Sequence, residues 1–470
     1  MNHKICPVVL CGGVGKRLWP VSRKTYPKQF SKFQGQHSLF QKTVNRFNDP
    51  RFESPLILTS NEYRFIIGEQ LNQAVTSNYG IIIEPMPRDT APAILAAALQ
   101  LNKKSGNSTM LVLPSDHSIG NDEELISLIY NSQSFAQAGE IIAIGIKPDR
   151  SETGYGWIEP SETGYGNSNL FRVKQFHEKP DLEKAENFYK QGKFLWNSGI
   201  YLFSTETIIE AFKEYSPKLL KYVAAAVENS TIDLDFIRLD KQSWNGIEPI
   251  SIDYAIMDKA PNMLVTTYQF GWDDLGDWNA VWRENQKDQN GISSSGNVFS
   301  SKCKNSYLRS ENANQILVAL GCEDLVVVST TDAVLVAKTD QTQDVKNAVD
   351  QLEQAGYTQS WQNLIENRYW GKVETLLNEE KVQINRLEIN PGKNIVLQRH
   401  SFRSEHWVVL KGKANITLED RKITLQENQS LDVPMGTKHS LSNLTDKPLI
   451  LVEVKTGSQL DMNDTERFES

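Results

Sequence analysis

Short apolar runs alternate with longer amphipathic stretches through the first 285 residues of the chain. Apolar runs of this length predict buried strands, and the candidates are Ile5–Leu10, Leu56–Thr59, Met110–Leu113, Ile141–Ile146 and Ile200–Phe203. One intervening helix is well marked, because Asp89 and Thr90 can cap it and Ile94–Leu101 is rich in alanine and leucine. Strands that alternate with helices predict an α/β domain over residues 1–285.

The pattern changes twice after this domain. Residues 286–356 hold short β-type runs and then a helix with one apolar face, which predicts a small β-rich connecting domain with a terminal helix. From residue 357 onward, short alternating segments are separated by glycine and proline turns, such as Pro391-Gly392 and Gly412. This spacing predicts an all-β barrel or sandwich over residues 357–470. We expect the polar, acidic residues 461–470 to form a loosely attached tail.

Composition narrows the class of protein. A chain of 470 residues is too long for one ordinary core. Its net charge is −8, and its basic residues are dispersed outside residues 16–28, whereas a nucleic-acid-binding protein needs a basic face. The four cysteines show no CxxC spacing, and no stretch has the length and apolarity of a membrane span. We therefore expect a cytoplasmic protein with neither nucleic acid nor membrane as a partner.

The first predicted strand leads into a glycine turn, Gly12-Gly13-Val14-Gly15, which is followed by Arg17 and later by Lys28. Sheets of α/β proteins bind ligands at the carboxyl ends of their strands, and glycines there let backbone N–H groups approach a polyphosphate. Arg17 and Lys28 can balance its charge. The spacing fits neither the P-loop nor the dinucleotide fingerprint. The residues alone therefore predict a site for an anion.

The stretch Leu10–Phe30 resembles the N-terminal signature of nucleotidyl-sugar pyrophosphorylases, and its Arg-Leu-Trp-Pro and Pro-Lys-Gln-Phe details are similar to the mannose-1-phosphate guanylyltransferase branch. The resemblance extends over nearly all of the chain. It implies a Rossmann-like nucleotidyltransferase domain that converts GTP and mannose 1-phosphate to GDP-mannose and pyrophosphate. It also implies that Arg17 and Lys28 act in catalysis. The nucleotide-binding residues that it implies are Leu10, Gly12, Gly13 and Gly15.

Two aspartates are candidates for a metal site. Asp116 follows a predicted strand, and Asp274 lies in the segment Trp-Asp-Asp-Leu-Gly-Asp-Trp at 272–278. Joining two phosphorylated reactants requires cations that absorb their charge, and Mg²⁺ takes one or two carboxylates plus phosphate oxygens. A single aspartate in such a position is more often a helix cap or a turn residue. Asp116 and Asp274, however, both match the motifs of the family. We expect Asp116 and Asp274 to hold Mg²⁺ and to act in catalysis.

The resemblance also implies a sugar-phosphate pocket. Its residues for mannose 1-phosphate are Gly154, Tyr155, Glu178, Lys179 and Asn197. Asp253 lies in another matching segment, and a binding role and a structural role explain it equally well. The family's guanine-contacting segment corresponds to residues 84–92, where Arg88 and Thr90 are expected to bind nucleotide. Asp89 replaces the family's asparagine there; a carboxylate still accepts hydrogen bonds from guanine N–H groups but cannot donate to O6.

The C-terminal part contains a second cluster of candidate ligands. Gln398 and His400 are two residues apart on one predicted strand and so point to the same face, and Glu405 and His439 can reach them from neighbouring strands. One amide oxygen, two imidazoles and one carboxylate suit a divalent ion such as zinc, cobalt, manganese or iron. The spacing matches both cupin motifs and resembles the C-terminal isomerase domain of bifunctional mannose-6-phosphate isomerase/mannose-1-phosphate guanylyltransferases.

That second resemblance implies a metal-dependent interconversion of fructose 6-phosphate and mannose 6-phosphate, with Arg403 binding the substrate. The chain departs from the family at His400-Ser401-Phe402, where three consecutive histidines are usual, and at Arg368–Gly371. Two alternatives stay open: a guanylyltransferase whose cupin is only a metal-stabilised assembly module, and a non-catalytic regulator that binds sugar nucleotides. Assembly into a homo-oligomer is likewise left open. A regulator could lose the predicted catalytic residues, and this chain keeps all four.

Overall fold

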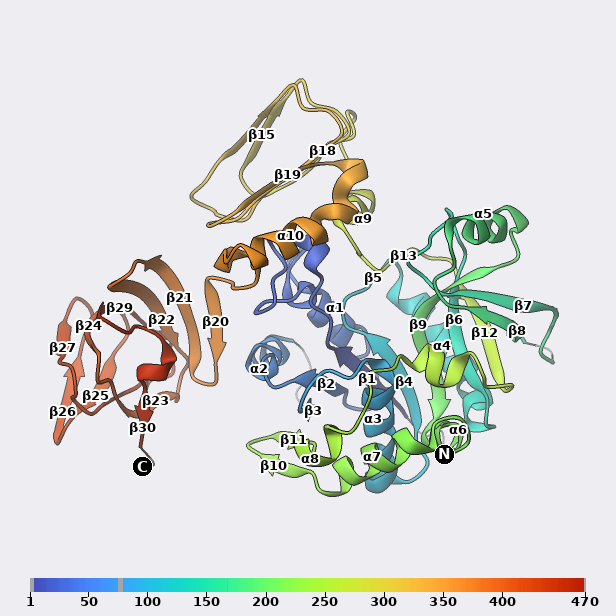
Figure 1. Ribbon diagram of the computed structural model, residues 1–470, viewed down its shortest axis with the longest axis horizontal. Coiled ribbons are helices and arrows are strands. Elements are labelled where there is room, and N and C mark those ends of the chain that lie inside the picture. Colours follow the sequence, from blue (N-terminus) through green and yellow to red (C-terminus); the bar gives the residue numbers. More distant parts are fainter. Residues whose placement is uncertain (1–3, 75–78, 167, 469–470) are drawn as a thin grey trace. The chain divides into compact units, whose positions relative to one another are not determined.

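The computed structural model describes residues 4–74, 79–166 and 168–468 (Figure 1). The chain divides into two compact units, one ending at Trp361 and the other beginning at Gln362. Among the described residues, every buried hydrophobic cluster lies wholly within one unit or the other. Each unit therefore has its own core.

The first unit is built on a mixed 11-stranded sheet. Its strands, in sheet order, are β10 (Thr231–Asp233), β11 (Phe236–Arg238), β3 (Gly80–Glu84), β2 (Leu56–Ser60), β1 (Ile5–Cys11), β4 (Thr109–Pro114), β9 (Leu195–Ser204), β6 (Ile141–Ile146), β12 (Met263–Tyr268), β8 (Phe171–His177) and β7 (Trp157–Gly164). β1 runs parallel to β2 and β4, whereas β9 is antiparallel to β4 and β6. The loops that follow β1 and β4 therefore leave the same edge of the sheet.

Helices cover both faces of this sheet, which is why its central strands are continuously apolar. Val8 and Val9 of β1 are both fully buried, but they belong to the cores on opposite faces. The helices on the face of Val8 are α3 (Thr90–Ser105), α6 (Thr205–Tyr215) and α7 (Pro217–Glu228), and those on the face of Val9 are α1 (Leu39–Arg46), α2 (Arg64–Gln73), α4 (Asp122–Gln137) and α5 (Leu182–Gln191). The predicted helix is α3, and the Asp89 side chain caps it by accepting a hydrogen bond from the Thr90 N–H.

A stack of short strands follows the sheet domain, after α8 (Lys241–Trp244), β13 (Trp272–Asp273) and α9 (Trp278–Glu284) (Figure 1). Its strands are β14 (Ser293–Ser295), β15 (Val298–Ser301), β16 (Tyr307–Ser310), β17 (Leu317–Leu320), β18 (Leu325–Ser329) and β19 (Val334–Lys338). β14, β16 and β18 pair in parallel, as do β15 and β17, and β19 closes the stack in antiparallel. The helix α10 (Val345–Gln354) then packs its apolar face on Trp19, which belongs to the glycine-rich segment.

The second unit consists of two antiparallel sheets around a single apolar core. One sheet has the order β20 (Ile365–Arg368), β21 (Gly371–Asn378), β22 (Val382–Ile389), β29 (Leu449–Gly457), β24 (Arg403–Lys411) and β27 (Ser430–Val433). The other has the order β26 (Arg421–Leu425), β25 (Ala414–Leu418), β28 (His439–Ser442), β23 (Asn394–Arg399) and β30 (Glu466–Arg467). The predicted fold, an α/β domain followed by a β-rich segment and a C-terminal cupin, is confirmed.

The expectation of a loosely attached tail is wrong. β30 pairs with β23, and Asp464 just before it is buried. The polar composition of this segment suggested solvent, but the carboxylate of Asp464 accepts hydrogen bonds from the main-chain N–H groups of Ser401 and Phe402. Residues 461–468 therefore belong to the folded unit.

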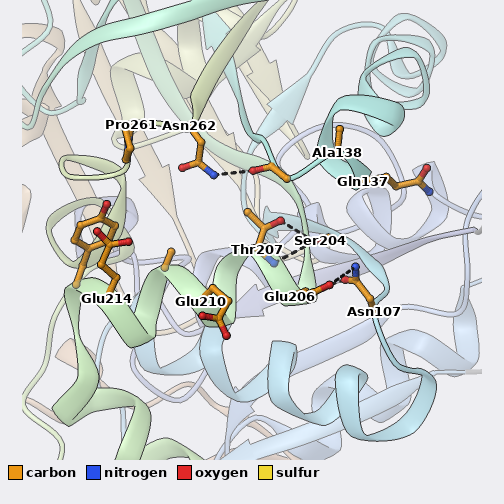
Figure 2. A pocket seen from close by; sticks show the side chains of 13 residues that line it. Asn107, Gln137, Ala138, Ser204, Glu206, Thr207, Glu210, Glu214, Pro261 and Asn262 are labelled. Carbon is orange, nitrogen blue, oxygen red and sulfur yellow. Dashed lines mark hydrogen bonds between the residues drawn. The ribbon is translucent and has the colours of Figure 1, made fainter.

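A hollow of about 440 Å³ opens at the amino ends of β4, β6 and β12 (Figure 2). Glu206, Glu210 and Glu214 of α6 line it, together with Asn107 and Asn262. The glycine-rich loop and Asp116 follow the carboxyl ends of β1 and β4, so this hollow lies at the other end of the strands from the predicted site.

No helix in the described ranges is long and apolar enough to span a bilayer.

Candidate active site and metal centre

The glycine-rich loop follows β1 and borders open space. A side chain added at Gly12 or Gly13 would meet no atom within 4 Å. Gly15 is different, because its φ is +70° and a Cβ there would lie 2.9 Å from Cγ of Lys28. The carbonyl of Leu10 accepts a hydrogen bond from the Ser115 N–H (3.2 Å), which ties the loop to the end of β4. The loop thus exposes its backbone while it packs closely against Lys28.

Lys28 joins the two predicted metal ligands. Its buried Nζ lies 2.9 Å from Oδ2 of Asp116 and donates a hydrogen bond to the carbonyl oxygen of Asp274 (2.7 Å). Burial opposes the charge of Lys28, but the carboxylates of Asp116 and Asp274 raise its pKa. Burial likewise opposes ionisation of Asp116, and Lys28 nevertheless lowers the pKa of that carboxyl. Lys28, Asp116 and Asp274, three of the four predicted catalytic residues, therefore meet at the carboxyl edge of the sheet.

The carboxylate of Asp274 is held in a fixed orientation. Its Oδ1 accepts hydrogen bonds from the Tyr155 hydroxyl (2.7 Å) and the Gly276 N–H (3.0 Å). The Tyr155 ring packs edge-on against Trp196 and Trp272, each with centroids 5.2 Å apart. Tyr155, which was predicted to bind sugar phosphate, thus links the predicted sugar pocket to the predicted metal ligand.

Arg17, the fourth predicted catalytic residue, lies in a short 3-10 helix directly after the loop. Its side chain is exposed and makes no hydrogen bond or ion pair within the described part of the chain. The preceding Lys16 pairs through Nζ with Asp350 (2.7 Å) and Glu353 (3.0 Å) on α10. The structure therefore leaves Arg17 accessible to a ligand, but does not bring it against the two aspartates.

The predicted sugar-phosphate residues form two neighbouring clusters. Glu178 pairs with Lys179 (2.8 Å), and a Cβ at Gly156 would lie 2.7 Å from Oε2 of Glu178. Nδ2 of Asn197 donates to Oδ1 of Asp253 (3.0 Å), while the Asn197 N–H donates to the Gly156 carbonyl (2.8 Å). Burial raises the pKa of Glu178, and the charge of Asp253 adds to this effect. Asp253, whose role was left open, thus adjoins the predicted pocket.

The residues predicted to bind the base form hydrogen bonds with other residues of the first unit. Arg88 donates through Nη2 to the Asn245 carbonyl (3.2 Å), and its buried Nε has no hydrogen-bond partner among the described residues. The Thr90 hydroxyl accepts a hydrogen bond from the Ile252 N–H (2.8 Å), and Thr90 N–H is capped by the exposed Asp89. Gly154, in the sugar segment, similarly donates its N–H to Glu152 (3.0 Å).

Two charged residues near Asp274 were missed by sequence reasoning. Asp273 is buried, which raises its pKa, and it pairs with Arg283 (3.2 Å). The Arg150 guanidinium lies 4.8 Å from the centre of the Trp196 ring and 4.0 Å from Oδ2 of Asp273. Because Asp273 directly precedes the predicted ligand Asp274 in the sequence, it could have been identified from the sequence. Nothing in the local pattern around Arg150 indicates that it reaches this site.

The second unit brings three of its predicted metal ligands together. One ligand atom from each of His400, Glu405 and His439 lies within 4.8 Å of the other two, and all three residues are buried. Nε2 of His400 is 3.3 Å from Oε1 of Glu405, and Nε2 of His439 is 3.8 Å from Oε2. Gln398, the fourth predicted ligand, presents its amide nitrogen and not its amide oxygen to Nε2 of His439 (3.4 Å).

The hydrogen bonds of this cluster suit a cation. Nδ1 of His400 faces the Asp464 carbonyl (2.9 Å) and Nδ1 of His439 faces the Thr437 carbonyl (3.0 Å). Because a carbonyl only accepts, each Nδ1 carries the proton that faces its carbonyl, and the Nε2 atoms of His400 and His439 face the N–H donors of Arg403 (3.2 Å) and Gln398 (3.4 Å). Burial lowers the pKa of His400 to about 4, so its ring is neutral at neutral pH. Oε2 of Glu405 is buried and accepts no hydrogen bond from the residues that the structure describes, and a bound divalent ion would satisfy it.

Arg403 is buried within this cluster. Its Nε donates to Oε1 of Glu405 (3.1 Å), its Nη1 to the Asp461 carbonyl (2.8 Å), and its Nη2 faces Nε2 of His400 (3.2 Å). Its side chain is only 2% exposed. The structure thus places the predicted substrate arginine among the predicted metal ligands.

The α/β sheet, with its exposed glycine loop beside Lys28, has the architecture of a nucleotidyltransferase. A stack of short strands and a cupin-like unit follow it along the chain. Residues 6–291 match the family described as nucleotidyl transferase. Residues 296–352 match the MannoseP isomerase/GMP-like beta-helix domain, and residues 353–470 match the mannose-6-phosphate isomerase C-terminal domain.

Curated relatives match the chain from end to end. A mannose-1-phosphate guanylyltransferase of Salmonella montevideo is 39% identical over 99% of this chain and 98% of its own length, and one of Escherichia coli K12 is 38% identical with the same coverage. The chain therefore belongs to the mannose-1-phosphate guanylyltransferase family. It is a nucleotidyltransferase, and the predicted resemblance is confirmed.

Solved structures agree with this assignment. A crystal structure titled mannose-1-phosphate geranyltransferase, from Thermus thermophilus, is 28% identical and superposes with a TM-score of 0.66, covering 74% of this chain and 99% of that one. A mannose-6-phosphate isomerase from Helicobacter pylori is also 28% identical, with a TM-score of 0.50 over 57% of this chain and 99% of that one. Members of these families act on nucleotides and sugar phosphates, and both domain types generally use divalent metals.

Proposed function

We propose that the first unit transfers GMP from GTP to mannose 1-phosphate, forming GDP-mannose and releasing pyrophosphate. A phosphate oxygen of the sugar phosphate attacks the α-phosphorus, and the bond from that phosphorus to the pyrophosphate oxygen breaks. The main support is the placement of Lys28 between Asp116 and Asp274, beside a glycine loop with open space before it. This arrangement places positive charge where two anions have to meet.

The residues present fit Mg²⁺ at this site, because Asp116 and Asp274 flank one buried lysine and offer hard oxygen donors. When bound, the ion would supply charge neutralisation to the phosphates. The chain's own groups do the rest: Gly12 and Gly13 offer backbone N–H groups, Arg17 and Lys28 balance charge, and Tyr155 orients Asp274. Glu178 and Asn197 would bind sugar hydroxyls, and Lys179 would bind the phosphate.

Pyrophosphate release from GTP and mannose 1-phosphate tests this proposal. We expect Asp116→Asn and Asp274→Asn each to lower kcat by at least about a hundredfold. Asp235→Asn, which changes an exposed aspartate in the β10–β11 turn, is the matched control and should keep the wild-type rate. Wild-type rates in both site variants would remove these carboxylates from the mechanism.

We further propose that the second unit interconverts mannose 6-phosphate and fructose 6-phosphate at a divalent ion such as zinc, cobalt, manganese or iron. His400, Glu405 and His439 would hold the ion, with Gln398 beside them; the unpartnered Glu405 oxygen and two imidazole lone pairs support this. When bound, the ion would polarise the substrate oxygens. Metal-free protein that is reloaded with the ion should isomerise fructose 6-phosphate. If folded, metal-loaded protein shows no turnover, the assembly-module alternative is favoured.

A further inference from the structure

The C-terminal segment, defined as residues 461–468, touches the predicted cupin metal site at two points. Its first contact is the carbonyl of Asp464, which accepts the Nδ1–H of His400 at 2.9 Å. Its second is the carbonyl of Asp461, which accepts a hydrogen bond from Nη1 of Arg403 at 2.8 Å. The segment therefore reaches one metal-ligand candidate directly and a neighbour of another.

A buried carboxylate anchors this segment. The side chain of Asp464 is 2% exposed, and it accepts hydrogen bonds from the N–H groups of Ser401 (2.8 Å) and Phe402 (3.1 Å). These N–H groups belong to the turn that connects His400 to Arg403. Beyond it, the Phe468 N–H donates to the Leu397 carbonyl (2.9 Å), and β30 pairs with β23. Asp464 thus fastens the segment to the turn at the metal-facing end of β23.

The consequence concerns the orientation of His400. A ligating imidazole works only if one ring nitrogen is protonated and held so that the other faces the metal. The Asp464 carbonyl does this for His400, because it can only accept a hydrogen bond. Arg403 donates to Nε2 of His400 and to Oε1 of Glu405, two atoms that an ion would need. The Asp461 carbonyl and the Thr465 hydroxyl (3.3 Å) give the guanidinium partners outside the ligand set.

We propose that the C-terminal segment is a working part of the cupin metal centre, in which Asp464 positions His400 and the Asp461 carbonyl holds Arg403 beside the ligands. Asp464 is a positioning residue, not a ligand. The inference rests on the proposed metal-binding function of the second unit. It assigns a role in metal affinity to the last residues of the chain.

Metal binding to the full-length chain tests this inference. Protein stripped by a chelator is titrated with Co²⁺ and Zn²⁺ by calorimetry, and the visible absorption of bound Co²⁺ reports ligand geometry. We expect Asp464→Ala to weaken both affinities tenfold or more and to change the Co²⁺ spectrum. Asp464→Asn keeps a carbonyl oxygen for the Ser401 N–H but turns an N–H₂ donor toward the Phe402 N–H, so it should weaken both affinities by a smaller factor, about threefold. Asp446→Ala, at an exposed turn of the same unit, should match the wild type.

The transferase assay makes these outcomes separable. Pyrophosphate release should be unchanged in all three variants, because Asp464 and Asp446 lie outside the first unit. Asp464→Ala with wild-type affinity and spectrum would overturn the inference, and so would Asp464→Asn if the alanine variant failed to fold and the asparagine variant bound normally. Wild-type protein that releases pyrophosphate but binds neither ion would overturn the metal site itself, and the inference with it.

Discussion

At the scale of single residues, Lys28 organises the transfer site before any ligand arrives. It is buried, it contacts Asp116 and Asp274, and Gly15 has no side chain where the lysine methylenes pass. Removing the lysine would leave two neighbouring carboxylates without a compensating charge. The residue therefore couples the loop conformation to the charge balance of the site.

The hydroxyl of Tyr155 should matter to catalysis although its ring could pack without it. A hydrogen bond to a charged group contributes about 1.5–3 kcal/mol, so we expect Tyr155→Phe to lower kcat for pyrophosphate release about ten- to a hundredfold. Tyr165→Phe is the matched control, because its hydroxyl also donates to a carboxylate, Glu140, at 2.8 Å. Equal rates in the two variants would show that the Tyr155 hydroxyl does not orient Asp274.

Glu84 should make stability depend on pH. Burial at the end of β3 raises the pKa of its carboxyl from 4.5 to about 8. The folded state thus favours the protonated carboxyl. The resulting contribution to the free energy of unfolding is complete below the pKa of the unfolded state and is lost as the pH rises through the pKa of the folded state. We expect Glu84→Gln to gain about 2–5 kcal/mol relative to wild type between about pH 5 and pH 9, measured by chemical denaturation. Exposed Glu62→Gln should show no such gain.

Candidate ligands were easier to predict than the residues that hold them. His400, Glu405 and His439 are predicted from the strand period and a known motif, and Asp116 because it follows a strand end; their metal-binding roles stay predictions. Arg150, Arg283 and Asp464 were not found, since each acts on a residue distant in sequence through a contact that only the folded chain makes. Local pattern carries no record of such contacts.

At the scale of secondary-structure elements, α10 packs against the residues that follow the glycine-rich loop. Its Val345 and Val349 pack on Trp19, and its Asp350 and Glu353 pair with Lys16. The ion pairs are partly exposed and contribute little on their own, so the apolar contact is the stronger link. The apolar stripe of α10 could be predicted from its periodicity, but the surface that it covers could not.

A charge on the buried face of α10 should therefore damage the transferase. We expect Val349→Asp to lower kcat/KM for GTP at least about tenfold, because a displaced loop misplaces the groups that bind phosphate. Ala348→Asp introduces the same charge at the neighbouring exposed position and is the control. Wild-type kinetics for Val349→Asp would show that the loop does not need the helix.

At the scale of the whole molecule, the two units have independent cores. The division into an α/β part and a β part could be predicted, because the period of the apolar pattern changes near residue 360. The strand order could not be predicted, since β9 crosses between β4 and β6 in the opposite direction and only tertiary packing determines that.

A chain ending at Trp361 should keep the transferase activity. We expect its kcat for pyrophosphate release to stay within about twofold of the full chain, because no core residue is lost. Size-exclusion chromatography with light scattering on both chains then tests the assembly-module alternative. A truncated chain that dissociates and loses activity would favour that alternative over an independent catalytic unit.

Separate cores also bear on how such a gene can change over generations. A mutation that unfolds the C-terminal unit leaves the core of the first unit intact, so the C-terminal coding region can be lost in a single step. Fusion in the reverse direction is equally simple, since no interior has to be rebuilt when the two reading frames join. Lineages that carry one unit, the other, or both are the expected result.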